Sequence, residues 1–247
     1  MVSFGHMNTN ENSKYFLPAA VVIAGLFIAG AVYWNGAHPS AGTGTVTPTP
    51  TAVDVKNVKI AGDPYIGKAD ATITIAFWTD YQCPYCKAVE VGGVPQIPTV
   101  AALPDVIKNY VDTGKVKIVF MDFTFLGQDS ITAGLYGRAI WKLYPDKYFD
   151  WRTAMYKAQD QEGDQGFGNA ASIDKLNATI AGLDAAKIAA DVKANTATYQ
   201  AALDADKAEG QKVGVDATPS FLIGTKLLKG AYPYDNLKAA IDEALAK

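Results

Sequence analysis

Cys83 and Cys86 are the only two cysteines of the 247-residue chain, and their spacing forms a C-x-x-C motif. A disulfide between them would close too small a loop to stabilise a fold, so the pair indicates chemistry. The motif directly follows an apolar run, residues 73–78, and the residues after it suit a helix. This order is typical of redox-active dithiols, because a helix N-terminus favours the thiolate of the first cysteine.

Metal binding is the alternative explanation of a cysteine pair. A zinc site needs about four ligands. The chain has no second cysteine pair, and its two histidines, His6 and His38, precede the globular part. A soft-metal site on the two thiolates and a purely structural reduced pair stay open. We expect redox chemistry that uses neither a metal nor a cofactor.

The N-terminal 57 residues divide into three segments. Residues 1–15 form a short tail that begins like an expression remnant. Residues 16–34 carry no charge and approach the ~20 apolar residues that span a bilayer, so we expect a single-pass transmembrane anchor. The small residues 29–31 (AGA) keep a cleaved secretory signal open as the alternative. Residues 35–57 are rich in Pro, Thr and Gly, as in flexible linkers.

Either N-terminal segment would place the remaining chain, residues 58–247, outside the cytoplasm, at the cell membrane or secreted. This part is long enough for one hydrophobic core. The whole chain has 22 basic and 25 acidic residues and no basic patch. This charge argues against nucleic acid as a partner.

Hydrophobic patterns around the motif predict a strand–helix–strand unit. β-Branched and aromatic residues predict strands at 71–78 and 115–123. A helix is expected at 86–91, is interrupted by glycines and prolines, and resumes at 105–111. A hairpin of two strands and a final helix are predicted at residues 219–223, 226–229 and 235–246.

Between these two parts lies a mostly helical block of about 85 residues, 128–212. We expect it to be an insertion that covers one side of the dithiol. Its helices are predicted at residues 130–142, 148–159, 173–181 and 184–212. Residues 160–169 form an acidic, glycine-rich loop in which carboxylates alternate as in calcium loops, but the glycine and closing glutamate of such loops are missing. We expect a solvated loop, and ion binding there stays open.

The chain resembles the DsbA-like thiol:disulfide oxidoreductases of the thioredoxin superfamily, in their membrane-anchored or secreted branch. The resemblance rests on residues 69–86 (ADATITIAFWTDYQCPYC), 213–221 (VGVDATPSF) and 230–245 (GAYPYDNLKAAIDEAL), and covers about residues 63–247. It implies an α/β, thioredoxin-like fold with a helical insertion, preceded by a transmembrane helix and a disordered linker. A lone C-P-Y-C also occurs in glutaredoxins, so the export segment, the insertion and the downstream Thr-Pro add the specificity.

This resemblance implies an extracytoplasmic dithiol oxidase that forms disulfide bonds in exported proteins. Cys83 would be the attacked thiol and Cys86 the resolving thiol, and Pro219 matches the family's catalytic cis-proline. Residues implied in substrate binding are Thr218, which would pair with an extended segment, Pro84 and Tyr85.

Two positions depart from the family pattern. Phe77 stands where members often have a buried glutamate that assists proton transfer, and Tyr85 stands where the most oxidising members have a histidine. Without that partial cation, the Cys83 thiolate has less support. Asp80 fits the family's common Asp-Tyr, and it is either a proton relay through water or a local cap.

Other functions stay open from sequence. A reductase or disulfide isomerase of the same fold is one alternative, because the direction depends on the reduction potential and the redox partner. A non-enzymatic metal- or peptide-binding module is another, because a fold does not establish a function. The resemblance implies reoxidation by a quinone-linked membrane protein of the DsbB or VKOR type. We expect a monomer, because the chain lacks the dimerisation domain of the family's isomerases.

Overall fold

The computed structural model describes residues 53–160, 164 and 166–247. The expected N-terminal tail, the anchor or signal, and most of the linker lie outside the described residues. Within the described ranges, no helix is both long enough and apolar enough to cross a membrane.

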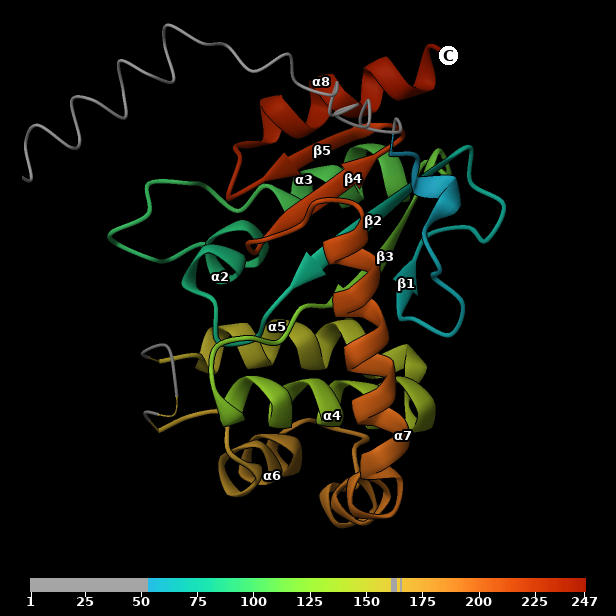
Figure 1. The fold of residues 1–247 in the computed structure, drawn as a ribbon. Coiled ribbons are helices and arrows are strands. Elements are labelled where there is room, and N and C mark those ends of the chain that lie inside the picture. Colours follow the sequence, from blue (N-terminus) through green and yellow to red (C-terminus); the bar gives the residue numbers. More distant parts are fainter. Residues whose placement is uncertain (1–52, 161–163, 165) are drawn as a thin grey trace, which may run out of the picture. The chain divides into compact units, whose positions relative to one another are not determined.

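Five strands form one mixed sheet in the order β1-β3-β2-β4-β5 (Figure 1). Their bounds are β1 Tyr65–Ile66, β2 Ile73–Thr79, β3 Val116–Asp122, β4 Ser220–Ile223 and β5 Lys226–Lys229. β2 and β3 are parallel, whereas β4 pairs antiparallel with both β2 and β5. The four predicted strands are confirmed. β1, which pairs antiparallel with β3, has no counterpart in the predictions because two residues are too few to show a period.

The helices fall into two groups. The sheet part carries α2 (Pro84–Glu90), α3 (Leu103–Val106, followed by a π-helical turn, Ile107–Val111) and α8 (Tyr234–Leu245). The inserted block, below the sheet in Figure 1, contains α4 (Gln128–Leu143), α5 (Tyr148–Ala158), α6 (Ala170–Thr179) and α7 (Ala185–Lys212). Short 3-10 turns lie at Val55–Asn57 and Pro145–Lys147. These bounds confirm the predicted helices.

Side-chain caps explain where two of the inserted helices begin. The Asn169 side chain accepts from the backbone N–H of Ser172 at 3.0 Å, and the Asp184 side chain accepts from that of Lys187 at 3.0 Å. Each bond satisfies a donor that the first helical turn leaves unpaired. α7 then runs for 28 residues, roughly 42 Å at 1.5 Å per residue, and reaches from the inserted block to the sheet.

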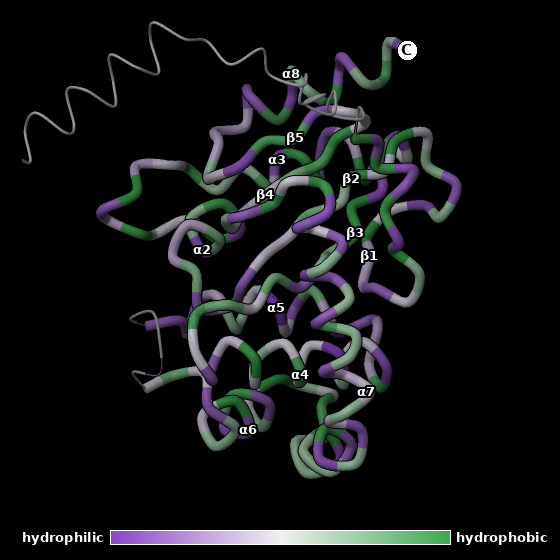
Figure 2. Tube along the Cα trace, in the orientation of Figure 1, coloured by the Kyte–Doolittle hydropathy of each residue, from purple (hydrophilic) through white to green (hydrophobic). Residues whose placement is uncertain are grey.

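The residues of β2 alternate between two hydrophobic clusters, as the pleat of a strand requires. Ile75 and Phe77 face the cluster that α2, α3 and α8 cover. Ala76 and Trp78 face the opposite cluster, which the start of the described chain and the residues after α7 cover. Because both faces are buried, the central strands are almost continuously apolar, and their trace is mostly green in Figure 2.

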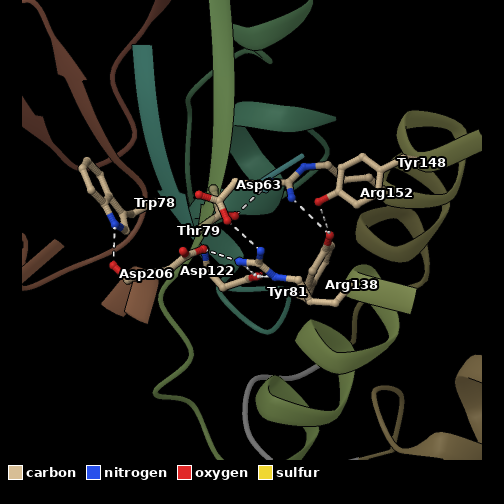
Figure 3. A network of polar contacts seen from close by, with 9 residues as sticks. All are labelled: Asp63, Trp78, Thr79, Tyr81, Asp122, Arg138, Tyr148, Arg152 and Asp206. Carbon is tan, nitrogen blue, oxygen red and sulfur yellow. Dashed lines mark hydrogen bonds and ion pairs between the residues drawn. The ribbon is translucent and has the colours of Figure 1, made fainter. Parts of the chain in front are cut away.

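Arg138 of α4 joins the inserted block to the sheet (Figure 3). Its guanidinium pairs with Asp63 at 2.6 Å, with Asp122 at the end of β3 at 2.8 Å, and with Asp206 of α7. Three buried carboxylates around one cation leave an excess of negative charge. Burial, together with the neighbouring carboxylates, raises the pKa of Asp206 to about 8. The cluster therefore holds a proton more tightly in the folded protein than in the unfolded chain.

Candidate active site

The dithiol lies where β2 ends and α2 begins. Cys83 is the N-cap residue of α2, and Pro84 takes the first helical position, which needs no N–H donor. Both thiols are free. Cys83 is 4% exposed and Cys86 is 0% exposed. Cys83 is thus the more accessible of the two, although a substrate can reach only a small part of its surface.

The two thiols have different acidities. A hydrogen bond from the Cys86 thiol lowers the pKa of Cys83, and the backbone N–H groups of Tyr85 and Cys86 add to this effect against the opposing effect of burial. Burial raises the pKa of Cys86 well above its ordinary value, and the adjacent Cys83 raises it further. The pair therefore favours a thiolate on Cys83 with a proton retained on Cys86.

The segment before β4 lies against the dithiol. The peptide bond between Thr218 and Pro219 is cis, as the resemblance implied. The Cys83 thiol donates a hydrogen bond to the carbonyl oxygen of Thr218 at 3.4 Å. Pro219 follows directly and contributes no N–H donor of its own. The structure thus brings Thr218, which the resemblance implied in substrate binding, to Cys83.

Asp80 stands three positions before Cys83, and 1% of its surface is exposed. Its carboxylate accepts from the backbone N–H of Gln82 at 2.8 Å, the backbone N–H of Phe125 at 3.0 Å and the hydroxyl of Ser130 at 2.6 Å. Burial raises the pKa of Asp80 in spite of these hydrogen bonds. The carboxylate therefore joins the dithiol loop to the loop after β3 and to α4. Its acceptance of the Gln82 N–H, two residues on, is the contact expected of a local cap.

Two exposed aromatic side chains flank the loop that carries the dithiol. Tyr85, in the first turn of α2, is 51% exposed, and Phe125, in the loop that Asp80 holds, is 47% exposed. Pro84 is half-buried. The sequence singled out Pro84 and Tyr85 but not Phe125, because tertiary hydrogen bonds such as that from Phe125 to Asp80 bring its loop to the site.

Phe77 contributes no polar group to the site. It is fully buried and stacked on Phe221 of β4, with ring centroids 4.1 Å apart. A buried carboxylate lies instead on α2, where Glu90 pairs with Arg152 of α5. The sequence pattern indicates neither residue, because a Glu and an Arg on amphipathic helices most often face solvent.

The acidic loop borders the site at Gln82, whose side-chain amide donates to the carbonyl oxygen of Phe167 at 3.0 Å. The Asp160 and Asp164 carboxylates accept from the backbone N–H groups of Phe167 and Asp129. In the part of the chain that the structure describes, no group of three or more His, Cys, Asp or Glu is arranged to hold a metal ion. Glu162 lies outside that part.

Comparison with known proteins agrees with this geometry. A family model described as thioredoxin matches residues 59–243. The chain is 27% identical over 186 residues to disulfide bond formation protein D of Bacillus subtilis (strain 168), a match that covers 75% of this chain and 78% of that protein. The crystal structure of oxidised BdbD from Bacillus subtilis matches with a TM-score of 0.67 and 26% identity, over 77% of this chain and 96% of that chain. The thiol-disulfide exchange protein α-DsbA2 from Wolbachia pipientis matches with a TM-score of 0.60 and 26% identity, over 74% and 87% of the two chains.

The chain therefore belongs to the thioredoxin family. Within that family it is a DsbA-like thiol:disulfide oxidoreductase, and Cys83 and Cys86 form its C-x-x-C motif. The predicted thioredoxin-like α/β fold with a helical insertion is confirmed, as is the predicted enzyme class. A non-enzymatic binding module is not favoured.

Proposed function

We propose that the protein is a dithiol oxidase that introduces disulfide bonds into exported proteins. The observation that supports this proposal most directly is the similarity to disulfide bond formation protein D of Bacillus subtilis, and the difference between the two thiols agrees with it. The pKa of Cys83 is lowered and that of Cys86 is raised. An oxidase becomes stronger as its reduced form becomes more stable, and the Cys83 thiolate exists only in the reduced form.

The first step forms a mixed disulfide. A substrate thiolate attacks Sγ of Cys83, and the Cys83–Cys86 bond breaks. The sulfur of Cys86 leaves as a thiolate. Because burial raises the pKa of Cys86, this thiolate takes up a proton.

The second step releases the oxidised substrate. A second substrate thiolate attacks the substrate sulfur of the mixed disulfide, and Cys83 leaves as a thiolate that the N–H groups at the start of α2 stabilise. The substrate has lost two electrons and two protons in total. The two electrons reside on the sulfurs of the protein, one proton is on Cys86, and the other passes to solvent.

Substrate would bind along the segment that precedes β4. The carbonyl oxygen of Thr218 loses its hydrogen bond when Cys83 enters a mixed disulfide, and it can then accept from the backbone of an extended substrate segment. Pro219 keeps an N–H donor away from this place. The exposed ring of Tyr85 and the adjacent Pro84 offer apolar contacts. Asp80 would hold the loop, and its relay of protons through water is part of the same proposal.

The proposal includes location and partners, which rest on the sequence and the resemblance. Residues 16–34 would anchor the domain at the extracytoplasmic side of the membrane, or direct its secretion if cleaved. The substrates would be thiols of exported proteins. A quinone-linked membrane protein of the DsbB or VKOR type would reoxidise the dithiol, and the protein would act as a monomer.

Two measurements test the oxidase function. The reduction potential of the dithiol against glutathione should be more oxidising than the ~−270 mV of thioredoxin. Protein treated with a chelator should oxidise a peptide with two thiols as fast as untreated protein, and Cys83→Ser should not oxidise it. A potential at or below that of thioredoxin would favour a reductase.

A further inference from the structure

One buried guanidinium contacts the chain on both sides of the dithiol. Arg152 of α5 is 2% exposed. It donates to the hydroxyl of Thr79 at 2.8 Å and to the hydroxyl of Tyr81 at 3.2 Å. It also pairs with both carboxylate oxygens of Glu90, with its Nε at 2.9 and 3.2 Å from them. Figure 3 shows the guanidinium turned toward Thr79 and Tyr81.

These partners stand at the two ends of residues 79–90, which we call the reactive segment because they contain the dithiol. Thr79 is the last residue of β2 and stands four positions before Cys83. Glu90 is the last residue of α2 and stands four positions after Cys86. Because a guanidinium is planar and donates in several fixed directions, it holds its partners at a set separation in a way that a lysine cannot. The end of β2 and the end of α2 are therefore tied to one point.

The guanidinium itself is held in place by aromatic rings. Its central carbon lies 4.4 Å from the centroid of the Phe120 ring and 5.3 Å from that of Tyr156. The Tyr156 hydroxyl accepts from Arg152 at 3.4 Å and donates to the carbonyl oxygen of Asp80 at 3.4 Å. Contacts with β3 and with its own helix thus also fix the position of Arg152.

A second side chain, at the C-cap of the same helix, contacts the reactive segment directly. The side-chain amide of Gln159 donates to the carbonyl oxygens of Tyr81 at 2.8 Å and Cys83 at 3.1 Å. Arg152 and Tyr156 stand four positions apart on one face of α5, and Gln159 directly follows the last residue of that helix. α5 and its C-cap residue therefore direct polar side chains to the chain segment that carries the dithiol.

We propose that Arg152, through its pair with Glu90, is a positioning residue that sets the acidity and the reduction potential of the dithiol. It keeps the first turn of α2 where the N–H groups of Tyr85 and Cys86 stabilise the Cys83 thiolate. This inference rests on the proposed redox function of the Cys83–Cys86 pair. The contacts of Arg152 with Thr79 and Glu90 form a clamp. Without this clamp, the start of α2 moves relative to the end of β2 and the Cys83 thiolate loses support. The reduced form of the dithiol then becomes less stable.

Arg138 provides the matched control, because it is also a buried arginine of the inserted block. It is 7% exposed, and its partners Asp63, Asp122 and Asp206 all lie outside residues 79–90. Arg152→Lys and Arg138→Lys remove the same donors from two buried sites. Only the first substitution touches the reactive segment.

The experiment measures two equilibrium properties of the dithiol in each variant. These are the thiolate absorbance of Cys83 against pH, in a Cys86→Ala background, and the equilibrium of the Cys83–Cys86 pair with glutathione. Arg152→Lys should raise the midpoint of Cys83 by about one pH unit and weaken the oxidising power about tenfold, which corresponds to ~30 mV. Arg138→Lys should change neither property.

A double variant separates positioning from loss of stability. Removing one partner of a buried ion pair is strongly destabilising, whereas replacing both by apolar residues is often neutral. Arg152→Met with Glu90→Leu should therefore remain folded and show the same two shifts. Thr79→Val, which removes one hydrogen bond of the clamp, should shift both properties less and in the same direction.

Unchanged acidity and potential in the double variant and in Thr79→Val would overturn the proposal, and so would equal shifts in Arg152→Lys and Arg138→Lys. Both readouts belong to the dithiol itself, so they respond to the clamp whether the protein oxidises or reduces its substrates. Turnover of a dithiol peptide by the unchanged protein tests the oxidase function separately.

Discussion

The thiol of Cys83 and the carbonyl oxygen of Thr218 are 135 positions apart in the chain and 3.4 Å apart in the structure. The antiparallel pairing of β2 with β4, in which Trp78 faces Ser220, produces this contact. The carbonyl oxygen accepts from the thiol when Cys83 is protonated and becomes free when Cys83 forms a disulfide. The reactive sulfur therefore shares its acceptor with the backbone of any substrate that pairs at Thr218.

The acidity of Cys83 should depend on a hydrogen bond from residue 86. The Cys86 thiol makes the largest contribution to the lowered pKa of Cys83. Cys86→Ser keeps a donor at this place, whereas Cys86→Ala removes it. Titration by thiolate absorbance should give both variants a midpoint below the free value of ~8.5, with the lower midpoint in Cys86→Ser. A midpoint at or above 8.5 in both variants would remove the argument from the helix start.

The two cysteines should differ in trapping substrates. Cys86→Ser should accumulate mixed disulfides with exported proteins through Cys83, because the more exposed thiol reacts and the resolving thiol is missing. Cys83→Ser should accumulate few, because Cys86 is fully buried. Non-reducing gels of cell extracts report the adducts. Equal amounts from both variants would mean that the assigned roles are wrong.

The dipeptide between the cysteines should set the reduction potential of the dithiol. Tyr85 supplies no positive charge, so we expect a reduction potential between the ~−270 mV of thioredoxin and the ~−120 mV of DsbA. Tyr85→His should raise it by tens of millivolts, because a partial cation stabilises the thiolate of the reduced form. Tyr85→Phe, which keeps the ring without the hydroxyl, is the control. An unchanged reduction potential in Tyr85→His would show that this position does not control it.

The aspartate cluster around Arg138 should make stability fall as the pH rises. Burial raises the pKa of Asp206 to about 8, so the folded protein binds this proton more tightly than the unfolded chain does. The stabilising contribution is complete below the unfolded value of ~3.9 and is lost as the pH rises through about 8. Thermal unfolding of the wild type should therefore occur at a lower temperature at pH 9 than at pH 5.

Asp206→Asn is the matched variant for this pH dependence, because an amide of the same size cannot release the proton. It should reduce the difference in melting temperature between pH 5 and pH 9. The lowered pKa values of surface carboxylates such as Asp242 act in the opposite sense, but only in acid. The same pH dependence in the wild type and in Asp206→Asn would exclude this carboxylate as its source.

Local patterns in the sequence were sufficient for the reactive pair and for most elements. The spacing of Cys83 and Cys86, the apolar strand before them and the helical periodicity after residue 128 each depend on neighbours within a few positions. A strand or a helix repeats its buried positions with a fixed period, and this period is visible along the whole segment. The position of Thr218 and Pro219 beside the dithiol came from the family resemblance, because no local pattern connects segments so far apart.

Only the tertiary structure decided which polar side chains serve the site. Arg152 and Glu90 lie on helices, where charged residues usually face solvent, and the sequence does not show that they are buried as a pair. The sequence also does not show that the Asp80 carboxylate accepts hydrogen bonds from Phe125 and Ser130, which lie 45 and 50 positions further along the chain. The physical reason is that a buried polar group takes its partners from whatever the fold brings within hydrogen-bonding distance, and that depends on the packing of segments remote in the chain.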